Sequence, residues 1–365
     1  MILILACKKP YNPPAITSKN NYLVVEGQIN TGPDSTIINL SRTVNLSAKT
    51  TLNPELNAIV TVEDNQNRSY IINEIGKGKY AAPGLNLPAT AECRLRIKTA
   101  NGKTYLSDFI TPKITPPIDS IGFVIQKDGI QIYLNTHDPT ANSRYYRWDY
   151  NETYIFHAFY DSYYKIVDGK PKFRGANESV YQCWRSDTSS TIVLNSSAKL
   201  AQDVIYQTPI TFLPSTSEKL EDRYSILVKQ FALTPVEFDY YQNLKKNTQE
   251  LGSIFDAQPS QLQGNIQCVS NPSEPVIGYI TAGTIAEKRI FIDSRYLPAW
   301  HATTFYDTYG CAIDTITVKD STHYPYFYGT IPPLYLPTTL PSAAAYPICV
   351  DCSLRGTLVK PVFWK

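Results

Sequence analysis

The side chains most able to do chemistry in this sequence are its histidines, cysteines and carboxylates. The four histidines, His137, His157, His301 and His323, lie far apart in the sequence, and none has the spacing of a metal-binding or nucleophile motif. No G-x-S-x-G, H-E-x-x-H or phosphate-binding loop occurs, and Gly76-Lys77-Gly78 is interpreted as a turn. Aspartates and glutamates could supply a glycosidase pair, but the pattern singles out no two of them. The sequence therefore predicts no enzyme, no metal site and no cofactor.

The seven cysteines could form disulfides or ligate a metal. Cys93 is interpreted as a core thiol, because it shares a strand face with Leu95 and Ile97. Cys349 and Cys352 form a C-x-x-C pair, but no second pair or histidine follows at the spacing of a zinc ribbon. We predict structural disulfides within the C-terminal region, and the sequence does not determine which cysteines pair. Free buried thiols are the alternative. The candidates for disulfides are Cys183, Cys268, Cys311, Cys349 and Cys352.

Cys7 follows the apolar run Ile4-Leu5-Ala6, and this pattern resembles the lipobox of bacterial lipoproteins. In such proteins the chain is cleaved before the cysteine, which becomes the acylated N-terminus. The apolar run is short and has no basic residues before it, which points to a start upstream of Met1. We expect residues 1–7 to be a residual signal and residues 8–21 a polar, proline-containing tether. An incidental cysteine in an apolar N-terminus is the alternative.

Composition sets the broad class of the protein. Hydrophobic residues make up 43% of the sequence, and no apolar run approaches the ~18 residues of a membrane helix, which excludes a disordered chain and a helical membrane protein. Lys plus Arg number 34 against 32 for Asp plus Glu, so bulk charge does not favour nucleic-acid binding. The 27 tyrosines, the 26 prolines and the low charge content favour an extracytoplasmic, mainly β protein.

Residues 22–114 have the pattern of a small antiparallel sandwich. Short apolar runs alternate with turn sequences, and Asn101-Gly102 between two such runs is a strong hairpin signal. An immunoglobulin-like or transthyretin-like sandwich is predicted. The expected strands are Tyr22–Ile29, Thr36–Leu40, Ala58–Glu63, Ser69–Glu74, Cys93–Thr99 and Thr104–Ile110.

A proline-rich linker, Thr115–Asp119, precedes a larger β-rich domain predicted over residues 119–365. Its start resembles a fibronectin type III module, with Tyr146 and Trp148 on one strand face. Insertions are expected at Asp161–Ser190 and Ser321–Pro347. The expected strands are Ser120–Gln126, Gly129–Thr136, Tyr145–Phe156, Tyr224–Gln230, Val276–Thr281 and Arg289–Asp293.

One helix is predicted near residues 235–251. Thr234 can cap it, Pro235 suits its first position, and Glu237 stands where a capping box requires it. The segment Gly252–Ile266 after the helix has few charges and is not expected to be regular structure.

Loops rich in aromatic residues are the segments that we predict to form a binding surface. Phe255 in the segment after the helix either fills the joint between helix and sheet or, with the aromatic cluster His323–Tyr328, contacts a partner. The predicted interaction surface consists of Phe255, Asp256, Gln258, Tyr324, Tyr326 and Tyr328.

An ordered set of short segments resembles the Bacteroidota outer-membrane lipoproteins grouped as domain of unknown function 4249. The resemblance implies an outer-membrane lipoprotein, often encoded beside a TonB-dependent transporter, and brings no ligand or catalytic residues with it. The segments are YLVVEG (22–27), RYSILVKQ (223–230), GSIFDAQPS (252–260) leading to GNI (264–266), VIGY (276–279), and CVDC (349–352) with KPVFW (360–364).

The function expected from these observations is that of a binding or accessory subunit of a TonB-dependent transporter. We expect the protein to be anchored to outer-membrane lipid through acylated Cys7, and to bind no nucleic acid. A secreted hydrolase acting on surface glycans and a structural adhesin are the alternatives.

Overall fold

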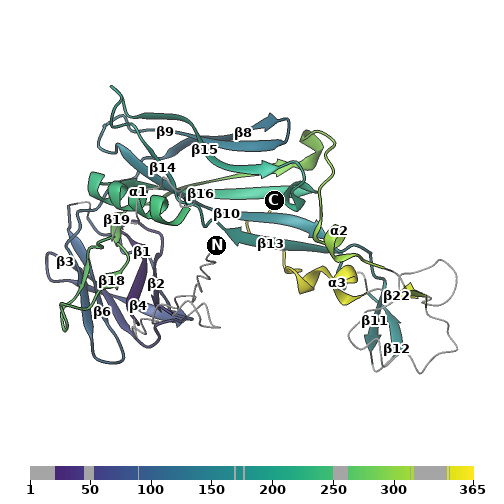
Figure 1. The fold of residues 1–365 in the computed structure, drawn as a ribbon, viewed down its shortest axis with the longest axis horizontal. Helices are drawn as coiled ribbons and strands as arrows, with labels where there is room; N and C mark the ends of the chain where they lie inside the picture. Colours follow the sequence, from purple (N-terminus) through teal and green to yellow (C-terminus); the bar gives the residue numbers. More distant parts are fainter. Residues whose placement is uncertain are drawn as a thin grey trace, which may run out of the picture. The chain divides into compact units, whose positions relative to one another are not determined.

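The computed structural model describes residues 21–44, 53–88, 90–167, 170–175, 177–249, 262–312, 314–315, 343–344 and 346–365. Strands dominate these ranges, and three α-helices accompany them (Figure 1), so the predicted mainly β fold is confirmed. The chain divides into two compact units. Unit 1 comprises Met1–Thr111 and Leu262–Ala282, and unit 2 comprises Pro112–Gln261 and Gly283–Lys365.

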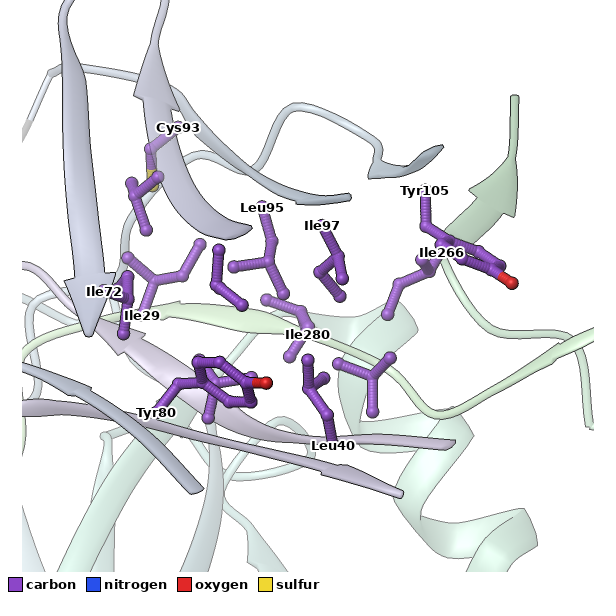
Figure 2. Close-up of a cluster of buried hydrophobic side chains, with 14 of the residues drawn as sticks. Ile29, Leu40, Ile72, Tyr80, Cys93, Leu95, Ile97, Tyr105, Ile266 and Ile280 are labelled. Atoms are coloured by element: carbon purple, nitrogen blue, oxygen red, sulfur yellow. The ribbon is translucent and has the colours of Figure 1, made fainter. Parts of the chain in front are cut away.

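Unit 1 is one sheet folded over a single core. Its strands are β1 (Leu23–Asn30), β2 (Thr36–Arg42), β3 (Ile59–Asp64), β4 (Ser69–Gly76), β5 (Lys79–Ala82), β6 (Cys93–Lys98), β7 (Thr104–Ser107), β17 (Ile266–Cys268), β18 (Val276–Ile277) and β19 (Thr281–Gly283). Their order is β17-β7-β6-β3-β4-β5-β2-β1-β18, and β19 also pairs with β1. In β6 the alternation buries Cys93, Leu95 and Ile97, which face Leu40 and Tyr80 across the core (Figure 2).

Short turns set the register between neighbouring strands. The Asn101-Gly102 turn joins β6 to β7 as predicted, with Gly102 at φ +85°. Gly76-Lys77-Gly78 also forms a turn and joins β4 to β5, with Lys77 at φ +55° and Gly78 at φ +72°. Strand β5 was not predicted, because four residues give too little alternation to distinguish a strand from a turn.

The segment Leu262–Ala282 corrects the predicted domain boundary. The sequence placed all residues of 119–365 in the second domain, yet β17 pairs with β7, and β18 and β19 pair with β1. Ile266 and Ile280 point into the core of unit 1 (Figure 2). The expected strand Val276–Thr281 is divided at Gly278, which has φ +123°. The chain thus returns to unit 1 after forming part of unit 2. Short-range sequence patterns do not predict such a return.

Glu274 fastens the returning segment by charge. Its side chain is only 8% exposed and accepts a hydrogen bond from the Tyr105 hydroxyl at 2.7 Å. Lys103 forms an ion pair with it, and Arg42 lies 3.8 Å away. Burial alone would raise the pKa of Glu274, but these partners hold the pKa below its usual value, so the carboxylate stays ionised and paired.

Unit 2 contains two sheets packed face to face. Its strands are β8 (Ile118–Gln126), β9 (Gly129–His137), β10 (Tyr145–His157), β11 (Tyr164–Val167), β12 (Lys170–Phe173), β13 (Gln182–Thr188), β14 (Val193–Ser196), β15 (Val204–Pro214), β16 (Arg223–Leu233), β20 (Ala286–Asp293), β21 (Asp314–Thr315) and β22 (Ala343–Ala344). One of these two sheets has the order β15-β9-β8, and the other has the order β13-β10-β16-β20, with β14 also on β10. Strands β11 and β12 form a separate two-stranded sheet, as do β21 and β22. Tyr146 and Trp148 are fully buried in the core between them, as their alternation predicted, and Trp148 Nε1 donates to Gln230 Oε1 at 2.8 Å.

Helix α1 (Pro235–Gln249) packs against β10, β14 and β16. Its start follows the predicted capping box, because the Thr234 N–H donates to Glu237 at 2.7 Å and the Glu237 N–H donates to the Thr234 hydroxyl at 3.3 Å. The described part of the helix reaches Gln249, and the predicted end at residue 251 lies outside the described residues. The remaining short helices are α2 (Phe305–Tyr309), α3 (Pro347–Val350), and the 3₁₀ turns η1 (Glu218–Leu220), η2 (Ser294–Tyr296) and η4 (Cys352–Leu354).

The two predicted insertions differ in content. Asp161–Ser190 contributes β13, a full member of the larger sheet, in addition to the β11–β12 hairpin. Residues 321–342 and 345 of the second insertion lie outside the described residues.

We predict that Ile280→Ala destabilises unit 1 by about 2–5 kcal/mol, because Ile280 is fully buried in the core and its loss leaves a cavity. Ile277→Ala, on the same segment but 45% exposed, is the matched control and should change stability by less than about 0.5 kcal/mol. Urea unfolding with hydrogen exchange read at β1 and β7 measures both. Equal stabilities for the two variants would contradict the assignment of this segment to the unit 1 core.

Candidate functional site

Residues 346–365, which we call the C-terminal strap, run along the larger sheet of unit 2 (Figure 1, yellow). The strap meets β13 through paired backbone hydrogen bonds of 2.9 Å between Thr357 and Trp184. Gly356 permits this approach, because a Cβ there would lie 2.6 Å from the Trp184 carbonyl oxygen and 2.7 Å from the Phe156 ring. A segment with little regular structure is therefore held in a fixed position.

Two disulfides fasten the strap, which confirms the predicted bridging. Cys352 is bonded to Cys183 on β13, 169 residues earlier, and Cys349 is bonded to Cys311. Cys268 was wrongly included among the bridging candidates, since it is a free thiol buried in the core of unit 1.

Cys93 is a buried free thiol of unit 1, as its strand face predicted. Burial raises its pKa to about 12, so the thiolate that redox or metal chemistry needs does not form at neutral pH.

Arg355, three residues after the disulfide-bonded Cys352, is the central charge of the site. Its guanidinium donates two hydrogen bonds to Glu218, of 3.0 and 2.7 Å, and both side chains are largely buried. The rings of Phe156, Phe305 and Tyr306 surround it with centroids 4.4–4.9 Å away. Burial alone would lower the pKa of Arg355, but Glu218 raises it above its usual value. The bidentate pair and the aromatic cage thus stabilise a charge that would otherwise be costly to bury.

The end of the strap docks on β16 and β20 through stacked rings and cations. Arg289 lies over the Phe363 ring at 3.5 Å, and Trp364 packs edge-on against Phe291 at 5.4 Å. Arg223 lies over Phe291 at 4.7 Å and also donates to the Lys365 carbonyl. The aromatic ending of the chain is therefore structural.

A hollow of about 640 Å³ lies beside Arg355, between the strap and β13. Leu354 and Phe305 contribute apolar surface to it, and Trp184, Asp187 and Arg355 contribute polar groups. Trp184 Nε1 is buried without a hydrogen-bond partner among the described residues. A hollow of this size and mixture suits recognition of a polar group by a partner or a small ligand.

A second hollow, of about 570 Å³, is lined by Trp300, His301 and Glu221. His157 Nδ1 lies 3.7 Å from Glu221 Oε1. Glu221 raises the pKa of His157, outweighing partial burial, which lowers it. The other oxygen of Glu221, Oε2, is buried without a partner in the described part of the chain.

Asp187 is the carboxylate that lines the first hollow in the described part of the chain, and it lies 3.5 Å from Arg185 and 3.7 Å from Lys219. Two further carboxylates, Glu152 and Glu218, are engaged by cations or hydroxyls. Glu152 accepts from the Tyr224 hydroxyl at 2.7 Å and pairs with Lys219 at 2.5 Å, while Glu218 is held by Arg355. Burial and Glu152 raise the pKa of Tyr224 well above its usual value, so the phenol remains a hydrogen-bond donor. This arrangement favours binding over proton transfer at Glu152 and Glu218, because both acids already have closely held partners.

The sequence-predicted site residues lie largely outside the described ranges. These are Cys7, Phe255, Asp256, Gln258, Tyr324, Tyr326, Tyr328 and His323.

Of the described histidines, His137 pairs with Asp119 at 2.8 Å, and His301 lines the second hollow. Within the described ranges, no three His, Cys, Asp or Glu residues form a group that could hold a metal ion. No helix there has the length and apolar character of a bilayer span. Sequence reasoning missed Arg355 and Glu218, which are 137 residues apart and share no motif.

Comparisons with known proteins give one family match. A family model described as Domain of unknown function (DUF4249) matches residues 8–289. No curated protein matches the chain. Among solved structures, the crystal structure of the chicken CNTN1 FN1-FN3 domains shows 11% sequence identity and a TM-score of 0.20. That match covers 58% of this chain and 62% of the chicken chain, less than two thirds of its length, and no argument about function follows from it.

We predict that disrupting the Cys183–Cys352 disulfide with Cys183→Ser and Cys352→Ser lowers stability by about 2–5 kcal/mol and loosens the strap, because the bond closes a very long loop. Urea unfolding measures the first effect, and hydrogen exchange at Thr357 measures the second. The control is non-reducing peptide mapping of the unaltered protein, in which, of the six cysteines within the described ranges, only Cys93 and Cys268 should react as free thiols after unfolding. Recovery of Cys268 in a bridge would overturn this pairing.

Proposed function

The chain belongs to the family described as Domain of unknown function (DUF4249), and we propose that it is a Bacteroidota outer-membrane lipoprotein that serves as a binding or accessory subunit of a TonB-dependent transporter. Cys7 would hold it to lipid, and unit 2 would contact the partner. The rigid, disulfide-fastened strap with its exposed apolar face is the observation on which the partner contact rests.

Two features support a location outside the cytoplasm. Both strap disulfides would be reduced in most cytosols, whereas they persist in an oxidising compartment. The run Ile4-Leu5-Ala6 before Cys7 has the form of a lipobox. Each buried CH₂ of an acyl chain contributes about 0.8 kcal/mol, so two or more chains on Cys7 would anchor the protein stably.

The strap carries four exposed apolar side chains within nine residues, which support partner binding and which we call its exposed apolar face. They are Leu354, Leu358, Val359 and Val362, of which Val359 is 74% exposed and Val362 fully exposed. Exposed apolar side chains that lie together mark interaction surfaces. Because disulfides hold the strap, little conformational entropy would be lost when a partner covers it.

A surface glycan hydrolase is the second candidate, and the hollow of Trp300 and Glu221 favours it. An indole and a carboxylate with an unpartnered oxygen in one hollow are the groups that a sugar ring and a glycosidic oxygen would meet.

We predict that Cys7→Ala, expressed with an upstream signal restored, releases the protein from the membrane fraction, because no other lipid attachment is proposed. Cys93→Ala provides the control and should remain in the membranes, since Cys93 is a buried core residue of unit 1. Fractionation and mass spectrometry of the mature N-terminus measure the outcome. An unmodified Cys7 on mature protein would refute the anchor.

We predict that Val359→Asp with Val362→Asp lowers co-purification of an outer-membrane barrel at least about tenfold, because two desolvated carboxylates would face the partner. Val236→Asp, a 66% exposed site on α1, is the matched control for added charge on an exposed valine. The thermal unfolding temperature should be the same for the unaltered protein, the strap variant and the Val236→Asp control. Undiminished co-purification by the strap variant would remove the strap from the interface.

A further inference from the structure

A third hollow in unit 2, of about 800 Å³, lies between α1, β14 and the start of β10, away from every residue assigned above. Its volume is in the range of small-molecule sites. Three lysines line it, Lys199 from the turn after β14 and Lys245 and Lys246 from α1. Within the described ranges, none of the residues lining this basic hollow is acidic.

The rings of the basic hollow come from two elements that pack together. Tyr145 opens β10 and Phe238 lies in the first turns of α1, with ring centroids 5.1 Å apart. Leu194 and Leu200 add apolar surface beside them. The hollow therefore offers an aromatic and aliphatic wall to one part of a ligand and ammonium groups to another.

The fold positions the backbone segments that carry these groups before any ligand arrives. Phe238 and Lys245 are seven residues apart on α1, two turns along one face. On the other wall, Arg144 donates to the carbonyls of Leu200 at 3.0 Å and Ser197 at 3.4 Å, which fixes the turn that presents Lys199. Pre-organised groups lose little entropy on binding.

The lysines have a structural explanation that covers only part of the arrangement. A cation such as Lys246 near the C-terminal end of a helix is favoured by the helix dipole. This effect does not explain Lys199, which belongs to a different element. Convergence of cations from two elements on one hollow that also has an aromatic wall is a feature of a site for an anion.

We propose that the basic hollow binds a small phosphomonoester whose phosphate meets the lysines and whose apolar ring lies against Tyr145 and Phe238. Lysine ammonium groups act as point charges that suit a dianionic phosphate, and the apolar wall suits a planar or saturated ring. The proposal does not depend on the transporter role or the lipid anchor.

Calorimetric titration of the full chain with phenyl phosphate tests the site. We expect phenyl phosphate to bind at least about tenfold more tightly than either phenol or inorganic phosphate, because only the intact molecule uses both halves of the hollow. Its affinity should fall as sodium chloride is raised. Phenyl sulfate, with one charge fewer, should bind more weakly; equal binding would overturn the choice of a phosphate.

The variant Lys245→Gln with Lys246→Gln should weaken phenyl phosphate binding at least about tenfold. Lys127→Gln with Lys360→Gln removes the same net charge from exposed sites that do not line the basic hollow and should leave binding unchanged. Thermal unfolding checks that both variants are folded, and Lys199→Gln alone provides a second probe from another element. Absence of binding by the unaltered protein, or equal weakening by both pairs, would overturn the proposal.

Discussion

A guanidinium can lie inside a protein only where its charge is matched and its N–H groups are satisfied, and Arg355 meets this condition through Glu218 and three aromatic rings. The position of Arg355 is in turn set by the Cys183–Cys352 bond three residues before it. The hollow beside β13 and the exposed face of the strap both follow from this arrangement. A covalent bond and a buried ion pair thus give a segment of little regular structure the rigidity that recognition needs.

Unit 1 shows the same principle without a covalent bond. Its sheet incorporates Leu262–Ala282 only after the chain has built much of unit 2, so the contacts that complete the core are of long range in sequence. Burial of Ile266 and Ile280 supplies the apolar contribution, and the Glu274 cluster specifies where the segment docks. Closing so large a loop costs little more than closing a short one, since the entropy grows only with the logarithm of its length.

Local sequence signals were sufficient to predict individual strands, turns and the helix start. They were insufficient to predict which of these elements pack against one another. Asn101-Gly102, the Thr234 capping box and the alternation around Trp148 each fix φ/ψ or a face within a few residues, and the structure has each of them where the sequence predicted. Cys268 was wrongly predicted as a disulfide candidate of the second domain, because its strand β17 pairs with β7 only after the chain returns to unit 1. Arg355 and the basic hollow were missed for the same reason, since their parts come from elements that no sequence window contains together.

Several of the segments on which the family resemblance rests contact one another in the fold. VIGY includes Gly278, where a Cβ would lie 2.0 Å from the carbonyl oxygen of Val25 in YLVVEG, so the two segments meet where the returning chain docks on β1. The ending KPVFW stacks on Arg223, which belongs to the RYSILVKQ segment. These segments therefore form contacts between parts of the chain that are far apart in the sequence, and those contacts complete the fold. The residues lining the basic hollow fall outside all of these segments, so the contacts that close the fold do not by themselves determine the hollow.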